Sequence, residues 1–389
     1  MIKNILKWAL LALVLIALVF FVFGPAQLEK GMNVVETHSD YPISEQAQEL
    51  HDSLIIGDWH ADSALWKRDL AVYGARGHVD IPRLQKGNVA LQMFTTVTKS
   101  PSGQNYEENE AGARDNITSL ALAQLWPLST WSSLTSRAVY QAQKMHDLAQ
   151  REPNSFRLIK SQSDLAQFAW DRQNNSTLVA GLIGTEGSHA LDGKLDNIKL
   201  LFDNGFRMMS LQHFFDNKLG GSLHGVSQIG LTDFGRQAVL EMQRLGIIID
   251  VAHSSESVVR DVLQMSARGL VVSHTGFKGY CDSPRNISDS LMQNIASKGG
   301  LIAVGYWEGA ICGTSPAHIA GAIAYGIELV GANHVALGSD FDGSVTTALD
   351  TSELVAITQA LLDLGVATTD IRKVMGANMQ QFLASQLPS

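Results

Sequence analysis

The sequence of 389 residues contains only two cysteines and has no excess of basic residues. Two cysteines exclude a small domain held by several disulfides, and the 34 glycines follow no period, which excludes collagen. The 29 Lys and Arg against 38 Asp and Glu give a net charge of −9, so we expect no nucleic-acid partner. Hydrophobic residues form 45% of the chain, too many for a disordered protein. The composition therefore indicates a large protein with a buried core, a class that includes many enzymes.

Long hydrophobic runs are also scarce, and the one that exists lies at the N-terminus. Every residue of 8–23 is apolar, and Lys3 and Lys7 precede the run. With the apolar residues before Lys7 it reaches the lower limit of about 17 residues for a transmembrane helix. A cleaved signal peptide is the alternative, but Gly24-Pro25-Ala26 is a poor cleavage site. We therefore predict that residues 1–26 form an uncleaved membrane anchor.

The two lysines also predict an orientation. Positively charged flanks stay in the cytoplasm, so the rest of the chain is expected on the periplasmic or extracellular side of the membrane. If the N-terminal segment were cleaved, the protein would be secreted. Residues 27–44 are predicted to be a polar linker, and residues 45–389 a single domain.

Eight short β-branched runs follow the linker, and amphipathic stretches lie between most of them. In 232–245, for example, apolar residues recur near helical spacing and Gly246 ends the run. Alternating strands and helices imply parallel strands with right-handed crossovers, so the sequence predicts a (β/α)8 barrel of TIM type. A helical insertion is expected at about 99–177. The predicted strands are Leu54–Gly57, Val89–Thr96, Leu178–Ile183, Met208–Leu211, Gly246–Val251, Gly269–Val272, Gly300–Gly305 and His334–Leu337.

Six of the eight predicted strands end in residues that can bind metal. Because the carboxyl ends of barrel strands meet at one mouth, we expect these side chains to lie close together. Histidines and carboxylates without cysteine suit Zn²⁺ or another divalent ion. In strand order the residues are His60 and Asp62, Glu186, His213, His253, His274 and Asp340.

The remaining histidines of the barrel region are not expected to bind metal, because a lone histidine is more often a hydrogen-bonded structural residue. His78 is left out of the predicted site because no strand delivers it to the mouth. The histidines interpreted as structural are His51, His146, His189, His224, His318 and His334.

Five stretches, in matching order and spacing from about Ser53 onward, resemble the membrane dipeptidase (renal dipeptidase) family of zinc peptidases. The resemblance implies an amidohydrolase-like (β/α)8 barrel with two Zn²⁺ per subunit. It also implies hydrolysis of the peptide bond of dipeptides through a metal-bridging hydroxide. The stretches are Asp58–Asp62, Gly184–Gly187, Gly230–His253, Val272–Asn286 and Leu337–Gly343.

The resemblance also implies a role for each site residue. His213 would contact the substrate, and Asp340 would be the acid/base that moves a proton from water to the leaving nitrogen. Arg285 would hold the free carboxylate of a dipeptide with its planar fork, although without the motif a surface salt bridge would be the simpler interpretation. The zinc ligands would be His60 and Asp62 for one ion, His253 and His274 for the other, and Glu186 bridging both.

Two further features depend on the resemblance. Trp59 stands where the family has a glycine and is expected to add bulk near the mouth. The family has a disulfide joining the loops that here contain Cys281 and Cys312, although the second cysteine is displaced by one residue. We predict this bridge, which an exported domain would form in an oxidising compartment; two free thiols are the alternative.

The sequence is also compatible with two other functions. One is a different hydrolase on the same scaffold, acting on an N-acyl amino acid or a lactam. The other is a catalytically silent, membrane-tethered binding protein that retains the metal structurally. The preferred dipeptide side chains and the formation of a homodimer are also left open.

Overall fold

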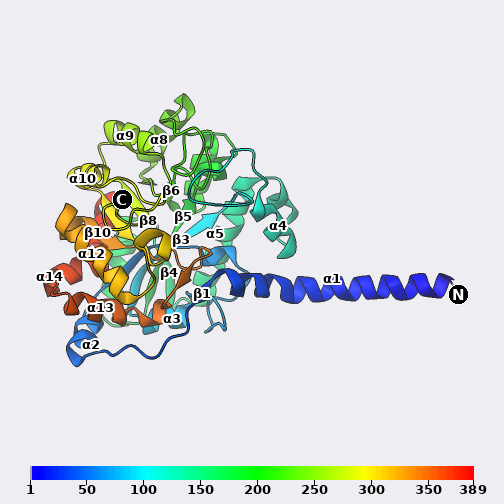
Figure 1. Ribbon diagram of the computed structural model, residues 1–389, viewed down its shortest axis with the longest axis horizontal. Coiled ribbons are helices and arrows are strands. Elements are labelled where there is room, and N and C mark those ends of the chain that lie inside the picture. Colours follow the sequence, from blue (N-terminus) through cyan, green and yellow to red (C-terminus); the bar gives the residue numbers. More distant parts are fainter. Residues whose placement is uncertain (1) are drawn as a thin grey trace.

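All eight predicted strands are present, and they close into a barrel (Figure 1). The computed structural model describes residues 2–389, and the side chains of all of these except Ile16 and Ala17. Neighbouring barrel strands are parallel, and pairing between β3 and β5 closes the ring, which confirms the TIM-type barrel. Around the ring the strands are β3 (Val89–Val97), β2 (Ile56–Ala61), β10 (Val335–Leu337), β9 (Leu301–Val304), β8 (Val271–Thr275), β7 (Ile248–Asp250), β6 (Phe206–Ser210) and β5 (Val179–Glu186).

Helices surround the barrel, and α8 (Asp233–Leu245) begins and ends at the residues that the sequence indicates. The Thr232 side chain accepts a hydrogen bond from the Gly235 backbone N–H at its start, and Gly246 ends it with a φ of 77°. Threonine is a favoured N-cap, and glycine adopts this left-handed conformation without steric cost. The other helices outside the insertion and the N-terminus are α2 (Glu45–Asp52), α3 (Ile81–Lys86), α7 (Asp196–Asp203), α9 (Glu256–Met265), α10 (Asp289–Ser297), α11 (Glu308–Ile311), α12 (Pro316–Val330), α13 (Val355–Asp363), α14 (Thr368–Arg372) and α15 (Asn378–Gln386).

The chain between β3 and β5 contains three helices, α4 (Asn116–Ala123), α5 (Leu134–Arg151) and α6 (Gln162–Arg172). It also contains a strand that the sequence does not predict, β4 (Phe156–Leu158), which pairs in parallel with the first residues of β5. Three residues are too few to leave a recognisable alternation.

A buried cluster inside the barrel draws on all eight strands and on α15. Phe382 of α15 lies against Gly269, just before β8, so α15 closes the barrel at the amino ends of the strands. Trp59 belongs to this cluster and packs edge-to-face on Phe382, with ring centroids 5.6 Å apart. The expectation that Trp59 adds bulk near the mouth is therefore wrong, because its ring is used to fill the barrel interior.

The N-terminal segment is the helix α1 (Ile2–Met32), which projects away from the barrel (Figure 1). It is long and apolar enough to cross a membrane, as either an anchor or a signal sequence. The helix continues past residue 26 into the segment predicted as a linker. The strand β1 (Val34–Val35) follows it and pairs with β11 (Thr346–Thr347), a contact that the sequence does not predict.

Candidate metal centre

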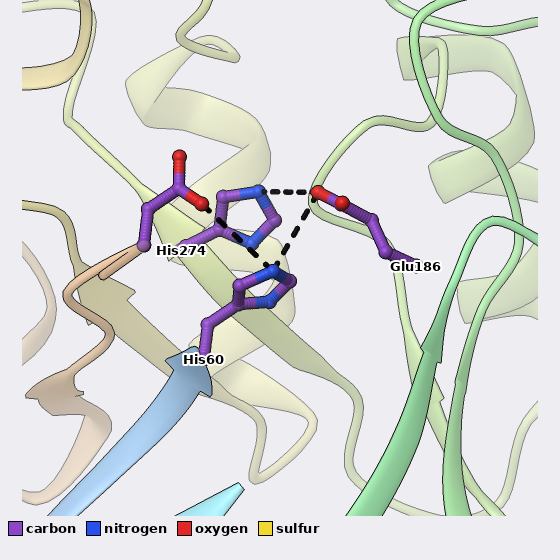
Figure 2. A group of neighbouring side chains, drawn as sticks. His60, Glu186 and His274 are labelled. Atoms are coloured by element: carbon purple, nitrogen blue, oxygen red, sulfur yellow. Dashed lines mark ion pairs between the residues drawn. The ribbon is translucent and has the colours of Figure 1, made fainter. Parts of the chain in front are cut away.

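Side chains from three barrel strands converge at the carboxyl mouth (Figure 2). His60 lies in β2, Glu186 ends β5 and His274 lies in β8. Oε1 of Glu186 is 3.5 Å from Nε2 of His60 and 3.3 Å from Nε2 of His274. All three side chains are buried, so their polar atoms need partners other than bulk water.

The other two predicted ligands complete this group. His253, in the turn after β7, places its Nε2 3.3 Å from Oε1 of Glu186 and 2.9 Å from Nε2 of His274. Asp62, directly after β2, places Oδ1 3.6 Å from Nε2 of His60. The structure thus brings all five residues predicted as metal ligands together.

His213 and Asp340 adjoin the same group. Nε2 of His213 lies 3.3 Å from Oε2 of Glu186, and Oδ1 of Asp340 lies 3.9 Å from Nε2 of His60. The loop of Asp340 is conformationally constrained: Asp340 and Asp342 have φ of 60° and 64°, in the left-handed region that non-glycine residues rarely adopt. The Ser339 hydroxyl accepts a hydrogen bond from the Phe341 N–H and helps to hold this turn.

The spacing of the donor atoms fits bound metal ions. In a tetrahedral site with Zn–N distances of about 2.0–2.1 Å, neighbouring ligand atoms are roughly 3.3 Å apart. The contacts of Glu186 with His253 and His274 fall close to this value, and those of His60 with Glu186 and Asp62 are only slightly longer. Nε2 of His60 is buried without a hydrogen-bond partner among the described residues, as expected for an atom that faces an ion.

Within the described residues, two groups of potential metal ligands have all their ligand atoms within 4.8 Å of one another, and their membership differs from the ligand sets that the resemblance implies. Glu186 belongs to both groups. Asp340 joins one of them in addition to its expected acid/base role, and His213 joins the other in addition to its expected substrate contact. These groups are His60, Glu186, His274 and Asp340, and Glu186, His213 and His253.

The charges of the site also call for a cation. Burial, together with the nearby Asp62 carboxylate, raises the pKa of Glu186 well above its usual value, and burial raises the pKa of Asp340 to about 8. Burial lowers the pKa of His213 to about 4 and that of His274 well below its usual value, so these imidazoles are neutral at pH 7. Clustered carboxylates and neutral imidazoles are the ligands that divalent metals prefer.

A serine that the sequence does not single out links two of the histidines. Oγ of Ser273 donates a hydrogen bond to Oδ2 of Asp250 (2.7 Å) and lies 3.1 Å from Nδ1 of His60 and 2.9 Å from Nδ1 of His274. A hydroxyl has one donor and two acceptor sites, so once it donates to Asp250 it accepts from both rings. Each ring then carries a proton on Nδ1, and its Nε2 is the atom that faces Glu186.

His213 is oriented in a similar way. Its Nδ1 lies 3.0 Å from the Lys99 carbonyl oxygen, which can only accept, so the proton is on Nδ1. Asp58 supports the first predicted ligand by accepting hydrogen bonds from the backbone N–H of His60 and of Ser339. The Asp58 and Asp250 carboxylates stand near strand ends like the predicted ligands, but they bind backbone and hydroxyl groups. Sequence position alone does not separate these two roles.

Arg285 is fully buried beside the cluster. Nη1 donates to the Ala252 carbonyl (3.0 Å) and Nη2 to the His274 carbonyl (2.7 Å), and the guanidinium lies over the Trp307 ring at 5.3 Å. No ion pair within residues 2–389 includes Arg285, so the surface salt bridge considered from the sequence is excluded. A buried guanidinium without a carboxylate partner in that range is suited to an anionic ligand.

A cavity of about 630 Å³ opens over the cluster and is lined mainly by apolar residues. Five aromatic residues that the sequence does not predict line it: Phe20 of α1, Trp66 after β2, Tyr106 from the insertion, Phe214 after β6 and Trp307 after β9. The Trp307 indole N–H donates to the Tyr106 hydroxyl at 2.8 Å. Tyr106 lies far from any strand end, so no local signal marks it.

The histidines excluded from the predicted site lie outside both potential ligand groups of the described chain. His51, for example, lies within hydrogen-bond distance of the Thr358 hydroxyl and the Gly87 carbonyl. His224 is closer to the site than expected, since its ring centroid is 5.4 Å from that of His253, but its Nδ1 contacts the Tyr106 carbonyl. His78 stacks on Phe341 and supports the loop of Asp340.

The predicted disulfide is confirmed. Cys281 and Cys312 are bonded, with Cα atoms 5.6 Å apart. Cys281 lies in the loop that also carries Arg285, and Cys312 follows α11 after β9. The bridge therefore joins two loops of the mouth.

A closed parallel barrel with buried histidines and carboxylates at its carboxyl mouth is the architecture of a TIM-barrel metalloenzyme. Residues 26–386 match the family model of membrane dipeptidases, peptidase family M19. The chain therefore belongs to the membrane dipeptidase family and is a metallo-dipeptidase.

Individual relatives agree with this assignment. Dipeptidase aclJ of Aspergillus oryzae is 28% identical over 354 residues, which cover 84% of this chain and 77% of the relative. Uncharacterized dipeptidase C965.12 of Schizosaccharomyces pombe is 25% identical over 323 residues, covering 81% of this chain and 70% of the relative.

Solved structures share the fold. The probable dipeptidase PvdM from Pseudomonas aeruginosa aligns with a TM-score of 0.70 and 18% identity, covering 88% of this chain and 98% of that one. A metallo peptidase from Rhodobacter sphaeroides, liganded with a phosphinate mimic of the dipeptide L-Ala-D-Ala, aligns with a TM-score of 0.65 and 20% identity, covering 86% and 99%.

Proposed function

We propose that this metallo-dipeptidase binds two Zn²⁺ ions through two ligand sets that share Glu186. His60 and Asp62 form one set, and His253 and His274 the other. The observation that carries the proposal is the position of Glu186, whose Oε1 lies within 3.5 Å of Nε2 of His60, His253 and His274. A carboxylate between two imidazole sets can balance the charge of two ions at once.

The chain's own groups divide the remaining work. Two bound zinc ions would supply a hydroxide nucleophile near neutral pH. Asp340, beside His60, would take the proton of the attacking water and deliver it to the leaving nitrogen. His213 would contact the substrate next to the scissile carbonyl; as a neutral ring with its proton on Nδ1, it can accept a hydrogen bond through Nε2 but cannot donate one to the oxyanion. Because Nδ1 of His213 donates a hydrogen bond to the backbone carbonyl of Lys99, Nε2 is the atom of this ring that would face the substrate.

Arg285 would select the substrate by its free C-terminal carboxylate. Its guanidinium is held by two backbone carbonyls, lines the cavity, and has no carboxylate partner within residues 2–389. A free carboxylate placed there would end the substrate one residue beyond the scissile bond, which favours dipeptides over longer peptides.

We further propose that α1 is an uncleaved anchor and that the barrel lies on the periplasmic or extracellular side. The positive flank at Lys3 and Lys7 supports this orientation. The disulfide between Cys281 and Cys312 supports it as well, because such bonds persist in oxidising compartments. The catalytic domain in this proposal is 45–389, with the helices of the insertion between β3 and β5.

Metal analysis of purified protein tests the proposal. We expect the wild type to contain two zinc ions per chain, His60→Ala to lose mainly one, and Glu186→Gln to lose affinity at both sites. Glu256→Gln, which changes a carboxylate at the start of α9, is the matched control and should retain both ions. A wild type without stoichiometric divalent metal, or one that holds metal yet cleaves no member of a dipeptide panel, would contradict the proposal.

A further inference from the structure

Ion pairs and a hydrogen bond hold the end of α1 against the barrel. Glu29, in the last turns of α1, is buried and pairs with Nε of Arg68 at 2.8 Å and with Nε of Arg76 at 2.6 Å. Arg68 also pairs with Asp342, two residues after Asp340. Next to α1, the Asn33 side-chain oxygen accepts a hydrogen bond from the Ser344 N–H at 2.8 Å. These bonds fix the direction of α1 relative to the catalytic loop.

α1 also forms part of the wall of the catalytic cavity. Phe20, Leu28 and Met32 line it together with the metal-site residues. Phe20 falls inside the apolar run of the sequence, which extends over 5–23 apart from Lys7. At about 1.5 Å per residue this run is roughly 28 Å long, close to the ~30 Å hydrocarbon thickness of a bilayer. If α1 crosses a membrane, the surface of that membrane must therefore lie near the cavity mouth.

A group of exposed apolar side chains lies beside α1. We call Leu122, Leu125, Leu128 and Trp131 the α4 patch; Leu128 is 73% exposed and Leu125 58%. The patch covers the end of α4 and the 3-10 turn Leu128–Trp131. Figure 1 shows α4 on the side of the barrel from which α1 projects, and α4 packs against α1.

The two sides of α4 have different surroundings. Ile117 and Leu120 line the cavity, whereas Leu122 and Leu125 are exposed to solvent. Clustered exposed leucines and a tryptophan are unusual on a water-facing surface and typical of segments that enter the headgroup region of a bilayer. Tryptophan in particular favours this interface.

We propose that the α4 patch rests on the phospholipid bilayer crossed by α1, so that the catalytic cavity opens at the membrane surface and takes apolar dipeptides from it. The inference rests on the anchor and the dipeptidase activity proposed above. α1 packs against α4, at whose end the patch begins, and the ion pairs of Glu29 hold α1 in a fixed direction relative to the barrel. A dipeptide with apolar side chains concentrates at the interface and meets the apolar lining of the cavity there.

A fluorescent label at Leu128 tests the contact. Leu128→Cys in the full-length chain, labelled with an environment-sensitive dye, is placed in phosphatidylcholine vesicles that contain lipids spin-labelled near the headgroup. Leu364→Cys is the matched control, an exposed leucine that ends α13 on the far side of the barrel (Figure 1). We expect the lipid quencher to remove most of the Leu128→Cys emission and none of the Leu364→Cys emission. Equal quenching of both labels by aqueous iodide alone would overturn the proposal.

A second variant tests the substrate class. Leu122→Gln combined with Leu125→Gln should raise the KM for an apolar dipeptide in vesicles several-fold and leave the KM for a glycine-only dipeptide unchanged. In detergent, where the bilayer is absent, the variant should have the same KM as the wild type for each of the two dipeptides. An unchanged KM for the apolar dipeptide in vesicles would contradict interfacial uptake.

The failures can be told apart. A wild type that retains no metal or cleaves neither dipeptide, while Leu128→Cys is quenched by lipid, refutes the proposed function but supports the membrane contact. A protein whose mass shows loss of α1, or that does not stay with the vesicles, refutes the anchor and the membrane contact together. Normal dipeptidase activity, together with a Leu128→Cys label that iodide quenches and the lipid quencher does not, refutes only the contact between the α4 patch and the membrane.

Discussion

Replacing Ser273 by alanine should weaken both proposed metal sites at once. The Ser273 hydroxyl fixes the Nδ1 protons of His60 and His274, which belong to different ligand sets, and donates to Asp250. Ser273→Ala leaves two buried N–H groups and one carboxylate oxygen without these partners. Each buried group left unsatisfied costs about 1–3 kcal/mol. Losing a hydrogen-bond partner behind a ligand typically costs about 10–100-fold in metal affinity.

We therefore expect the affinity for each of two Zn²⁺ ions to fall by about 10–100-fold, or roughly 1.4–2.7 kcal/mol per ion. The assay is titration of metal-free protein with Zn²⁺ in competition with a chromophoric chelator. Absorption of the Co²⁺-substituted protein reports the ligand geometry separately from the catalytic rate. Ser273→Thr retains the hydroxyl and should restore most of the affinity.

Ser210→Ala is the matched control. Ser210 is equally buried in a barrel strand, and its hydroxyl donates to the Gln212 backbone carbonyl at 2.9 Å instead of to a site residue. Its loss should lower stability and leave both affinities unchanged. Wild-type affinity in Ser273→Ala, or an equal loss in Ser210→Ala, would refute the idea that one hydroxyl sets both tautomers.

Four other changes have defined outcomes. Asp340→Asn should retain metal but lower kcat by about 10²–10⁴, measured on a dipeptide at saturating metal, because the proton shuttle is lost; unchanged kcat would exclude that role. Arg285→Ala should raise KM for free dipeptides and not for amidated ones, and an equal effect on both would exclude the carboxylate contact. Burial lowers the pKa of His51 from 6.5 to about 4. As the pH drops below about 6.5, His51 takes up a proton in the unfolded chain but not in the folded one, so the free energy of unfolding falls, by ~2 kcal/mol at pH 5. In urea denaturation at a series of pH values, His51→Gln should remove most of this pH dependence between pH 6.5 and 4. Reducing the bridge between Cys281 and Cys312, which are 31 residues apart, should cost about 3–4 kcal/mol in the same assay, whereas an unchanged midpoint would contradict that contribution.

The sequence alone determines the barrel and its predicted ligands. β-branched runs and amphipathic helices follow each other along the chain, so their number and order are readable without any long-range information. Residues such as His60 and Glu186 stand at the ends of these runs. In a parallel barrel the carboxyl ends of the strands meet at one mouth, so residues at these ends are expected there, although the alternation of side chains along a strand turns some of them, such as Trp59, into the barrel interior.

The tertiary structure decides which residues support the ligands and what encloses them. The hydroxyl of Ser273, which lies in β8 next to His274, acquires its role only because β7 brings Asp250 and β2 brings His60 beside it. Tyr106 reaches the cavity from an insertion whose path no local pattern specifies. Glu29 reads as a linker residue in the sequence, yet two arginines bury it and set the direction of α1. Such contacts join positions far apart in the chain, and their energies depend on distance and burial, which periodicity does not record.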